Sequence, residues 1–357
     1  MKIYKYGRMK LANMARLALM RRPKLKSLYW ECTLRCNAKC KHCFSNADGG
    51  NQPAELTTFE IKDQLRKIAQ RYRVNDIAFS VLGGEPLLRK DIFDVMGYAH
   101  ALGYSWGMAT NGTLIDSKAI QLMKETGMTT IAISLDGVRE THDNFRGVSG
   151  CYDKALESTR MLADAGFLDQ IQITTVFSKE NLNQMQEIYE TIKSSGANLW
   201  QIVSVEPVGR ASQNKDLLLD ISDYKILFDF IKKIRKERKL RVAYGHSHFL
   251  EIDYEFDVRD NCFTCQTGIA VAGILHNGDV FACPSVPRLP HLIQGNIRER
   301  DFCDIWENEF KLFRDENRTS CLKCKECEDW QFCYGGSFHT WNHEENKQNV
   351  CLKEGYE

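Results

Sequence analysis

The stretch ECTLRCNAKCKHCF, residues 31–44, holds four of the chain's fourteen cysteines. It follows the aromatic, apolar run SLYW, which predicts a β-strand. The last three cysteines, Cys36, Cys40 and Cys43, have the spacing C-x3-C-x2-C. A closed zinc site needs four ligands, usually in two pairs, and no second pair follows nearby. Three close thiolates can instead hold three irons of a [4Fe–4S] cube and leave its fourth iron open to another ligand.

The bulk composition is that of a soluble globular protein, with 43% hydrophobic and 27% charged residues in 357. The net charge of +1 indicates no nucleic-acid partner. No run approaches the ~18 apolar residues of a membrane span, and the basic N-terminal segment is not a cleavable signal, so we expect no stable membrane anchor. We therefore expect a cytoplasmic protein, in which clustered cysteines are metal ligands more often than disulfides.

Short apolar runs alternate with amphipathic helical segments up to about residue 240. Such alternation predicts parallel strands joined by right-handed helical crossovers. Six units are too few for a closed eight-fold barrel, so the predicted fold is α/β, a partial (β/α)6 barrel with its site at the carboxyl ends of the strands. The predicted strands are 27–33, 76–82, 105–110, 129–135, 169–177 and 199–205.

Three regions are expected along the chain. Residues 1–26 predict a short basic amphipathic helix around Met9, Leu11, Met14 and Leu17, which packs on its own domain. Contact with a peptide or a membrane surface is the alternative role. Residues 27–240 form the partial barrel. Residues 241–357 form a module of short strands, turns and many cysteines.

Sequence signals follow the predicted strands in order. The cysteine triad comes after the first, GGEP (83–86) after the second, TNG (110–112) after the third and SLDG (134–137) at the end of the fourth. The triad, GGEP and the segment from Ile133 to Leu156 together resemble the radical S-adenosylmethionine (SAM) superfamily, in particular its peptide- and protein-modifying branch. The resemblance covers nearly the whole chain.

This resemblance implies a [4Fe–4S] cluster on Cys36, Cys40 and Cys43, with SAM on the open iron. It also implies hydrogen-atom abstraction from a substrate by the 5′-deoxyadenosyl radical that SAM cleavage supplies. Glycine backbone at 83 and 84 approaches the SAM amino group closely because no side chain intervenes. The implied SAM-site residues are His42, Gly83, Gly84, Glu85, Asn111, Ser134 and Arg146. For Asn111, a simple turn is an equal alternative.

The second cysteine region resembles the SPASM module of enzymes that mature peptides and proteins. Its pattern, C-x(9–15)-G-x4-C, then C-x2-C-x5-C-x3-C and a final cysteine, implies one or two auxiliary [4Fe–4S] clusters. A zinc ribbon is the alternative interpretation. The implied cluster ligands are Cys262, Cys265, Cys283, Cys324, Cys327, Cys333 and Cys351.

One position departs from this pattern. Ser337 stands where the last cysteine of C-x2-C-x5-C-x3-C belongs, after Cys333 and three intervening residues. In the family that cysteine serves the first auxiliary cluster. Here the cluster would use both Cys262 and Cys265, leave one iron open, or take another ligand, and Cys321 is an extra thiol that would compensate.

Other chemistry-bearing residues have structural interpretations. Cys32, Cys151 and Cys303 are expected to be buried free cysteines, with a hydrogen-atom donor as the alternative role. Glu206, at the end of the sixth strand, is a candidate SAM or substrate contact. The histidines in two close pairs are expected to be structural or surface residues: His246, His248, His339 and His343.

The resemblance implies modification of a peptide or protein, with a flavodoxin or ferredoxin as electron donor. Fewer than 30 residues precede the first strand, so we expect the core, the N-terminal segment or a separate protein to recognise a peptide. A tetrapyrrole or other small molecule is the alternative substrate. A sulfatase-maturase role is disfavoured because Pro284 follows Cys283, where that branch has aspartate. A non-catalytic iron–sulfur or zinc protein is the alternative from a different class.

Overall fold

The computed structural model describes residues 2–47, 54–245 and 247–355. Within these residues, nine strands form one sheet in the order β7-β6-β5-β4-β3-β2-β1-β8-β9. All neighbours are parallel except β8 and β9. The strands are β1 (Ser27–Glu31), β2 (Ala78–Leu82), β3 (Ser105–Thr110), β4 (Met128–Ser134), β5 (Gln170–Phe177), β6 (Leu199–Ser204), β7 (Arg241–Tyr244), β8 (Val271–Ile274) and β9 (Val280–Phe281). The six predicted strands are β1 to β6, which confirms the α/β fold class.

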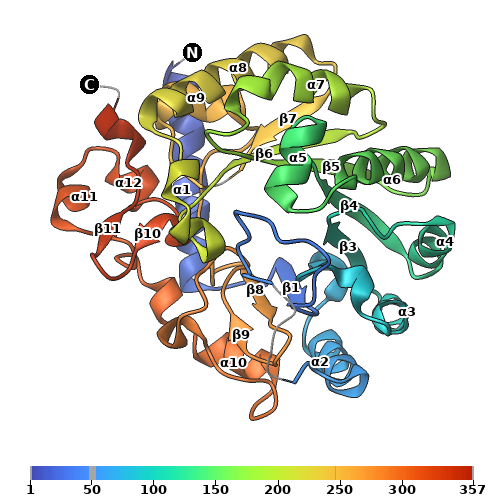
Figure 1. The fold of residues 1–357 in the computed structure, drawn as a ribbon. Helices are drawn as coiled ribbons and strands as arrows, with labels where there is room; N and C mark the ends of the chain where they lie inside the picture. Colours follow the sequence, from blue (N-terminus) through green and yellow to red (C-terminus); the bar gives the residue numbers. More distant parts are fainter. Residues whose placement is uncertain (1, 48–53, 246, 356–357) are drawn as a thin grey trace.

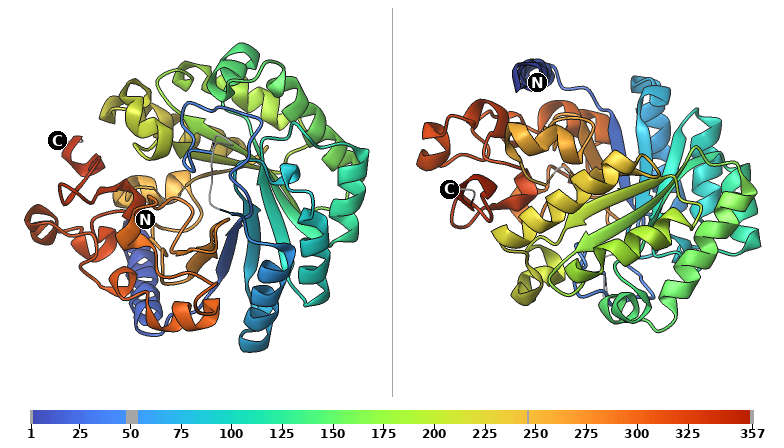
Figure 2. Two further views of the ribbon diagram at one scale, coloured as in Figure 1. Left: turned by 60° about the horizontal axis from the view of Figure 1, so that its bottom comes forward. Right: turned by 90° about the horizontal axis from the view of Figure 1, so that it is seen from above.

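Helices cover the outer face of the curved sheet, and the C-terminal part of the chain lies across its open side (Figures 1 and 2). A separate short hairpin joins β10 (Trp341–Asn342) to β11 (Lys347–Gln348). The helices are α1 (Lys2–Arg21), α2 (Thr58–Arg71), α3 (Ile92–Ala101), α4 (Ser117–Glu125), α5 (Arg139–Arg146), α6 (Cys151–Ala165), α7 (Met185–Lys193), α8 (Ile221–Glu237), α9 (Glu251–Val258), α10 (Phe302–Asn308), α11 (Leu322–Glu326) and α12 (Trp330–Cys333).

Strand periodicity separates the two faces of the sheet. Trp30, Phe79 and Trp200 point outward, where they are at most 1% exposed. Trp200, for example, stacks with Tyr189 of α7 at 6.1 Å between ring centroids. The alternate positions point inward, and most of them carry small or polar side chains. The inward positions near the carboxyl ends are Ser80, Leu82, Ala109, Ser134, Thr174, Val176, Gln201 and Val203.

The N-terminal helix α1 lies along the C-terminal part of the chain, beside α9 and α12 (Figure 1). Lys5 pairs with Asp257 at 3.3 Å. Of the apolar residues around which the sequence predicts this helix, Met9 is buried, but Leu11 and Met14 are 67% and 66% exposed. Arg16 is buried instead, with its guanidinium over the ring of Tyr334, which follows α12.

The sheet continues past the predicted barrel. β7 pairs with β6, and β8 of the cysteine-rich part pairs with β1. β8 and β9 are only four and two residues long, so their periodicity is too short to read from sequence. The domain limits 1–26, 27–240 and 241–357 stay predictions. Across the described residues, no helix combines the length and apolar character needed to cross a bilayer.

Candidate functional site

The cysteine loop, residues 32–47, pairs edge to edge with the GGEP turn after β2. The Gly84 N–H donates to Thr33 O at 2.7 Å. A β-carbon on Gly83 would lie 2.3 Å from Thr33 O, and one on Gly84 2.2 Å from Arg35 O. No side chain fits at such separations, so both glycines are required for the turn to approach the cysteine loop.

A cavity of about 250 Å³ lies at the carboxyl ends of β2 to β5, against the cysteine loop. It brings together all but one of the residues predicted for the cluster and for SAM. Those that line it are Cys36, Cys40, His42, Cys43, Gly83, Gly84, Asn111, Ser134 and Arg146. The parallel strands end at one edge of the sheet, which explains why distant sequence motifs meet there.

Glu85 is the predicted SAM-site residue that does not line the cavity. It is fully buried, and its carboxylate accepts hydrogen bonds from Thr110 Oγ1 and the Asn111 N–H, both at 2.9 Å. Burial raises the pKa of Glu85. The Asn111 side chain in turn donates to Asn37 Oδ1 at 2.8 Å. Glu85 therefore anchors the loop after β3, which holds the cysteine loop.

Arg146 reaches the cluster cysteines but is already paired. Its guanidinium lies 2.5 Å from Asp136 and donates to Cys40 Sγ at 3.6 Å. Burial opposes ionisation of the Asp136 carboxyl group. The nearby Arg146 guanidinium outweighs this effect and holds the pKa of Asp136 below its usual value. His42 stacks on Phe145 at 4.4 Å, and burial lowers the pKa of His42 to about 3. Asp136, whose carboxylate positions Arg146, was not among the residues predicted for the site.

Arg210 is a second cavity residue that the sequence analysis missed. It lies on the 3-10 helix η4 (Gly209–Gln213) and donates to Cys40 O at 2.8 Å and to Ala47 O at 3.1 Å. The available signal was its position just after the sixth predicted strand, four residues beyond Glu206. Arg210 fixes the far end of the cysteine loop from across the sheet.

The first group of C-terminal cysteines centres on Cys265 and Cys283, which both hydrogen-bond Thr267. Although burial opposes ionisation, Arg318 holds the pKa of the Cys265 thiol below its usual value. A thiolate is the form that binds a metal. The N–H that follows Ser337, that of Phe338, also hydrogen-bonds the Cys265 thiolate. The position that departs from the SPASM pattern thus lies beside this group.

In the second group, burial and the neighbouring Cys351 and Cys324 raise the pKa of Cys333, and Cys351 also raises that of Cys324, which indicates that the three thiols lie near one another. Cys321 Sγ lies 3.3 Å from Cys324 Sγ. Cys321 is therefore placed at this second group, not at the first. Cys327 follows at the end of α11, where its N–H donates to Cys324 O at 3.2 Å.

The remaining candidates lie outside the cavity. Glu206 accepts from Ser204 Oγ at 2.9 Å and lies 3.7 Å from His248 Nε2. His339 contacts Ser247 at 3.3 Å. His343 contacts the Phe338 carbonyl at 3.1 Å, whereas His246 is outside the described residues. Cys32, Cys151 and Cys303 are all buried, as expected.

The donor sets fit iron–sulfur clusters better than single ions. Within the described ranges, no three Cys, His, Asp or Glu side chains converge closely enough to hold one metal ion. A cube instead takes each thiolate on a different iron. At the cavity, Cys36 and Cys40 already accept N–H groups from Ala38, at 3.4 Å, and from Arg146.

Sequence comparisons agree with this geometry. The radical SAM superfamily matches residues 30–192, and an iron–sulfur cluster-binding domain, SPASM, matches residues 262–328. An AdoMet-dependent heme synthase of Methanosarcina barkeri is 30% identical over 336 residues, which cover 89% of this chain and 92% of that protein. The chain belongs to the radical SAM superfamily.

Other similar proteins carry different functional names. A pre-heme d1 synthase of Dinoroseobacter shibae is 32% identical over 336 residues, covering 86% of this chain and 80% of that protein. The mycofactocin maturase MftC of Mycobacterium tuberculosis is 29% identical over 313 residues, covering 87% and 77%. The relatives therefore include enzymes named for the synthesis of hemes and for the maturation of mycofactocin.

Solved structures support the fold of this radical SAM enzyme. Streptococcus suis SuiB bound to S-adenosylmethionine superposes with a TM-score of 0.72 at 18% identity, covering 95% of this chain and 80% of SuiB. The AdoMet-bound anSMEcpe structure gives 0.71 at 19%, covering 92% and 94%. The two family regions themselves give the enzyme a SAM-binding [4Fe–4S] cluster in its barrel and an iron–sulfur SPASM domain at its C-terminus.

Proposed function

We propose that this radical SAM enzyme modifies the side chains of an iron tetrapyrrole. The observation that carries the proposal is the end-to-end match with the AdoMet-dependent heme synthase, over 92% of that protein's length. The maturase MftC is matched over 77% of its length. An Fe-coproporphyrin III synthase of Methanosarcina barkeri, 28% identical over 361 residues, supports the same substrate class.

The inner face of the sheet suits a broad, rigid substrate. Ala109, Ser134 and Thr174 line the cavity with small side chains, and Leu82 and Val176 add an apolar edge. A planar macrocycle cannot bend around large side chains, so small residues on this wall favour it.

In the proposed reaction, Cys36, Cys40 and Cys43 hold the cluster on which bound SAM supplies the radical. The turn at Gly83 and Gly84 presents bare backbone to the cavity. Asp136, through Arg146, keeps the cysteine loop in register and excludes water from its inner side.

The chemistry of a propionate side chain shows why a SPASM domain would be needed. Loss of a hydrogen atom from the carbon next to the ring, followed by loss of CO₂ and one electron, leaves a vinyl group. That electron needs an acceptor, and we assign this task to an auxiliary cluster held by the C-terminal cysteines.

Anaerobic turnover tests the proposal directly. The reconstituted enzyme is incubated with SAM, a reductant and Fe-coproporphyrin III, and 5′-deoxyadenosine and porphyrin masses are followed together. We expect 5′-deoxyadenosine to form in step with porphyrin that has lost CO₂. Porphyrin left unchanged while 5′-deoxyadenosine accumulates would reject this substrate class.

Peptide maturation is the second candidate, favoured by the similarity to MftC. A short peptide encoded beside the gene is the substrate to assay in the same reaction, and its modification alone would replace the tetrapyrrole proposal. For either substrate we propose a cytoplasmic location and a flavodoxin or ferredoxin as electron donor.

A further inference from the structure

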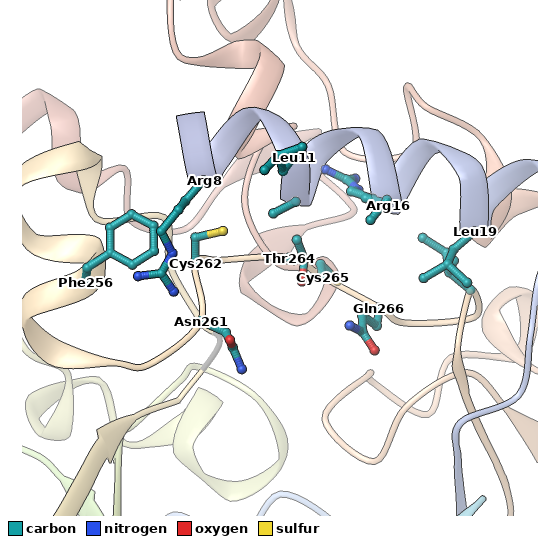
Figure 3. A pocket seen from close by; sticks show the side chains of 13 residues that line it. Arg8, Leu11, Arg16, Leu19, Phe256, Asn261, Cys262, Thr264, Cys265 and Gln266 are labelled. Carbon is teal, nitrogen blue, oxygen red and sulfur yellow. The ribbon is translucent and has the colours of Figure 1, made fainter. Parts of the chain in front are cut away.

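Arg16 is a buried arginine on α1 that faces cysteines far away in the sequence. Its side chain is 4% exposed. It lines a cleft of about 390 Å³ together with Cys262 and Cys265, which lie beneath the helix (Figure 3). Its guanidinium carbon lies 3.8 Å from the centroid of the Tyr334 ring, one residue after a second-group cysteine.

Arg318 approaches the same cysteines from the chain that leads into α11. It is 9% exposed and donates to Thr267 O at 2.6 Å and to Cys265 O at 2.8 Å. Thr267 is the residue that hydrogen-bonds both first-group thiols. Arg16 and Arg318 therefore bring two positive charges to the first cysteine group.

Neither arginine has an acidic partner among the described residues. Nε and Nη1 of Arg16, and Nε of Arg318, are buried and make no hydrogen bond there. Other buried arginines of the chain are paired: Arg89 with Asp91 at 2.9 Å, and Arg259 with Glu255 at 3.5 Å. Burial and then repulsion by Arg318 lower the pKa of Arg16 to about 10, which shows how poorly the protein alone compensates this charge.

A buried cation without a counter-charge is strongly destabilising, and two of the same sign more so. An iron–sulfur cube held by thiolates is anionic, and its sulfurs accept N–H groups. We propose that Arg16 and Arg318 are the counter-charges of the first auxiliary cluster and that Arg16 raises its reduction potential. The inference rests on the proposed assignment of Cys265 and Cys283 as ligands of that cluster.

The sign follows from charge. A reduced cluster is more negative than an oxidised one, so a nearby cation stabilises the reduced form and moves the midpoint potential upward. The same contact makes α1, which precedes both matched family regions, a functional part of the iron–sulfur module.

The test is an anaerobic redox titration of the full chain, followed by electron paramagnetic resonance without SAM or substrate. Arg16→Gln is expected to shift one auxiliary signal to a more negative midpoint, and Arg16→Lys to stay near the wild type. Arg21→Gln removes an exposed charge from the same helix and is expected to leave every midpoint unchanged.

A variant that keeps Arg16 guards against a failure to fold. Ala12 lines the same cleft one helical turn away, so Ala12→Glu supplies a carboxylate to Arg16 and is expected to lower the same midpoint.

Two results are distinguishable. An unchanged midpoint in fully iron-loaded Arg16→Gln and Ala12→Glu would overturn the inference alone. Wild-type protein that holds about 4 irons, enough for only one cube, would overturn the ligand assignment with it.

Discussion

The carboxylate of Glu31 lies 2.6 Å from the guanidinium of Arg288. Glu31 ends β1, directly before the cysteine loop, and Arg288 lies five residues after Cys283. The other Glu31 oxygen lies 3.3 Å from His276 Nδ1. Although burial opposes ionisation, Arg288 holds the pKa of Glu31 below its usual value. One buried carboxylate thus joins the segments that carry the SAM cluster and the first auxiliary group.

Glu31→Gln should destabilise the fold by about 2 kcal/mol, because Arg288 and the nearly buried His276 lose their shared acid. The Arg288 side chain is 25% exposed and can still reach water, which limits the loss. Urea unfolding under anaerobic conditions measures it. Asp94→Asn is the matched control, since it removes an exposed partner of Lys62 at 2.7 Å and should cost less than about 1 kcal/mol. Equal losses in both variants would contradict a connecting role for Glu31.

Gly84→Ala should prevent assembly of the SAM cluster. Its β-carbon would lie 2.2 Å from Arg35 O, so the cysteine loop has to move. Iron analysis and 5′-deoxyadenosine formation with SAM and a reductant measure the loss. Gly97→Ala is the control, because its β-carbon meets nothing closer than 3.6 Å and lies inside α3. Normal iron loading in Gly84→Ala would show that the turn tolerates a side chain.

Of the four cysteines in the cysteine loop, three should be needed to hold the cluster, whereas Cys32 should not. Cys40→Ser is expected to lose about 4 irons and all SAM cleavage, because the two remaining thiolates cannot hold the cluster. Cys32→Ala is expected to keep both, at a stability cost of about 1 kcal/mol for a small buried side chain. The comparison fails if Cys32→Ala also loses the cluster.

Glu206 should make stability fall as pH rises. Burial raises the pKa of Glu206 to about 8, whereas an unfolded chain has about 4.3. The folded state therefore binds the extra proton between these values. The resulting stabilisation is complete below about pH 4 and is lost as the pH rises through about 8.

The neighbours of Glu206 do not reverse this sign. Ser204 donates a hydrogen bond to the Glu206 carboxylate. Tyr224 stays neutral, because burial and then the charge of Glu206 raise its pKa. His248 stays neutral because burial lowers its pKa to about 3. Relative to Glu206→Gln, the wild type should lose roughly 3 kcal/mol between pH 5 and pH 8, measured by urea unfolding. The surface variant Glu180→Gln, which removes a partner of Lys41, should show no such trend. If the difference in unfolding free energy between the wild type and Glu206→Gln did not change with pH, Glu206 would be ionised in the native state.

Strand and motif order were predictable because both are local. The strands β1 to β6 are five to eight residues long, so the apolar pattern of each lies within a short stretch of sequence. Each motif follows directly after its strand. Glu85 shows the limit: the GGEP pattern implies a SAM contact, but its carboxylate is used by Thr110 and Asn111. Its partners follow another strand and cannot be read from its own surroundings.

The cysteine spacing, the class of fold and the departure at Ser337 can be read from the sequence, since these depend on neighbours in the chain. Which charges meet depends on how the elements pack in three dimensions. Glu31 and Arg288 lie 257 positions apart, and α1 places Arg16 beside Cys262 and Cys265. Such contacts depend on sheet register and helix docking, which sum many weak interactions along the whole chain. The proposed pairing of Arg16 and Arg318 with the first auxiliary cluster therefore arises only once the chain has folded.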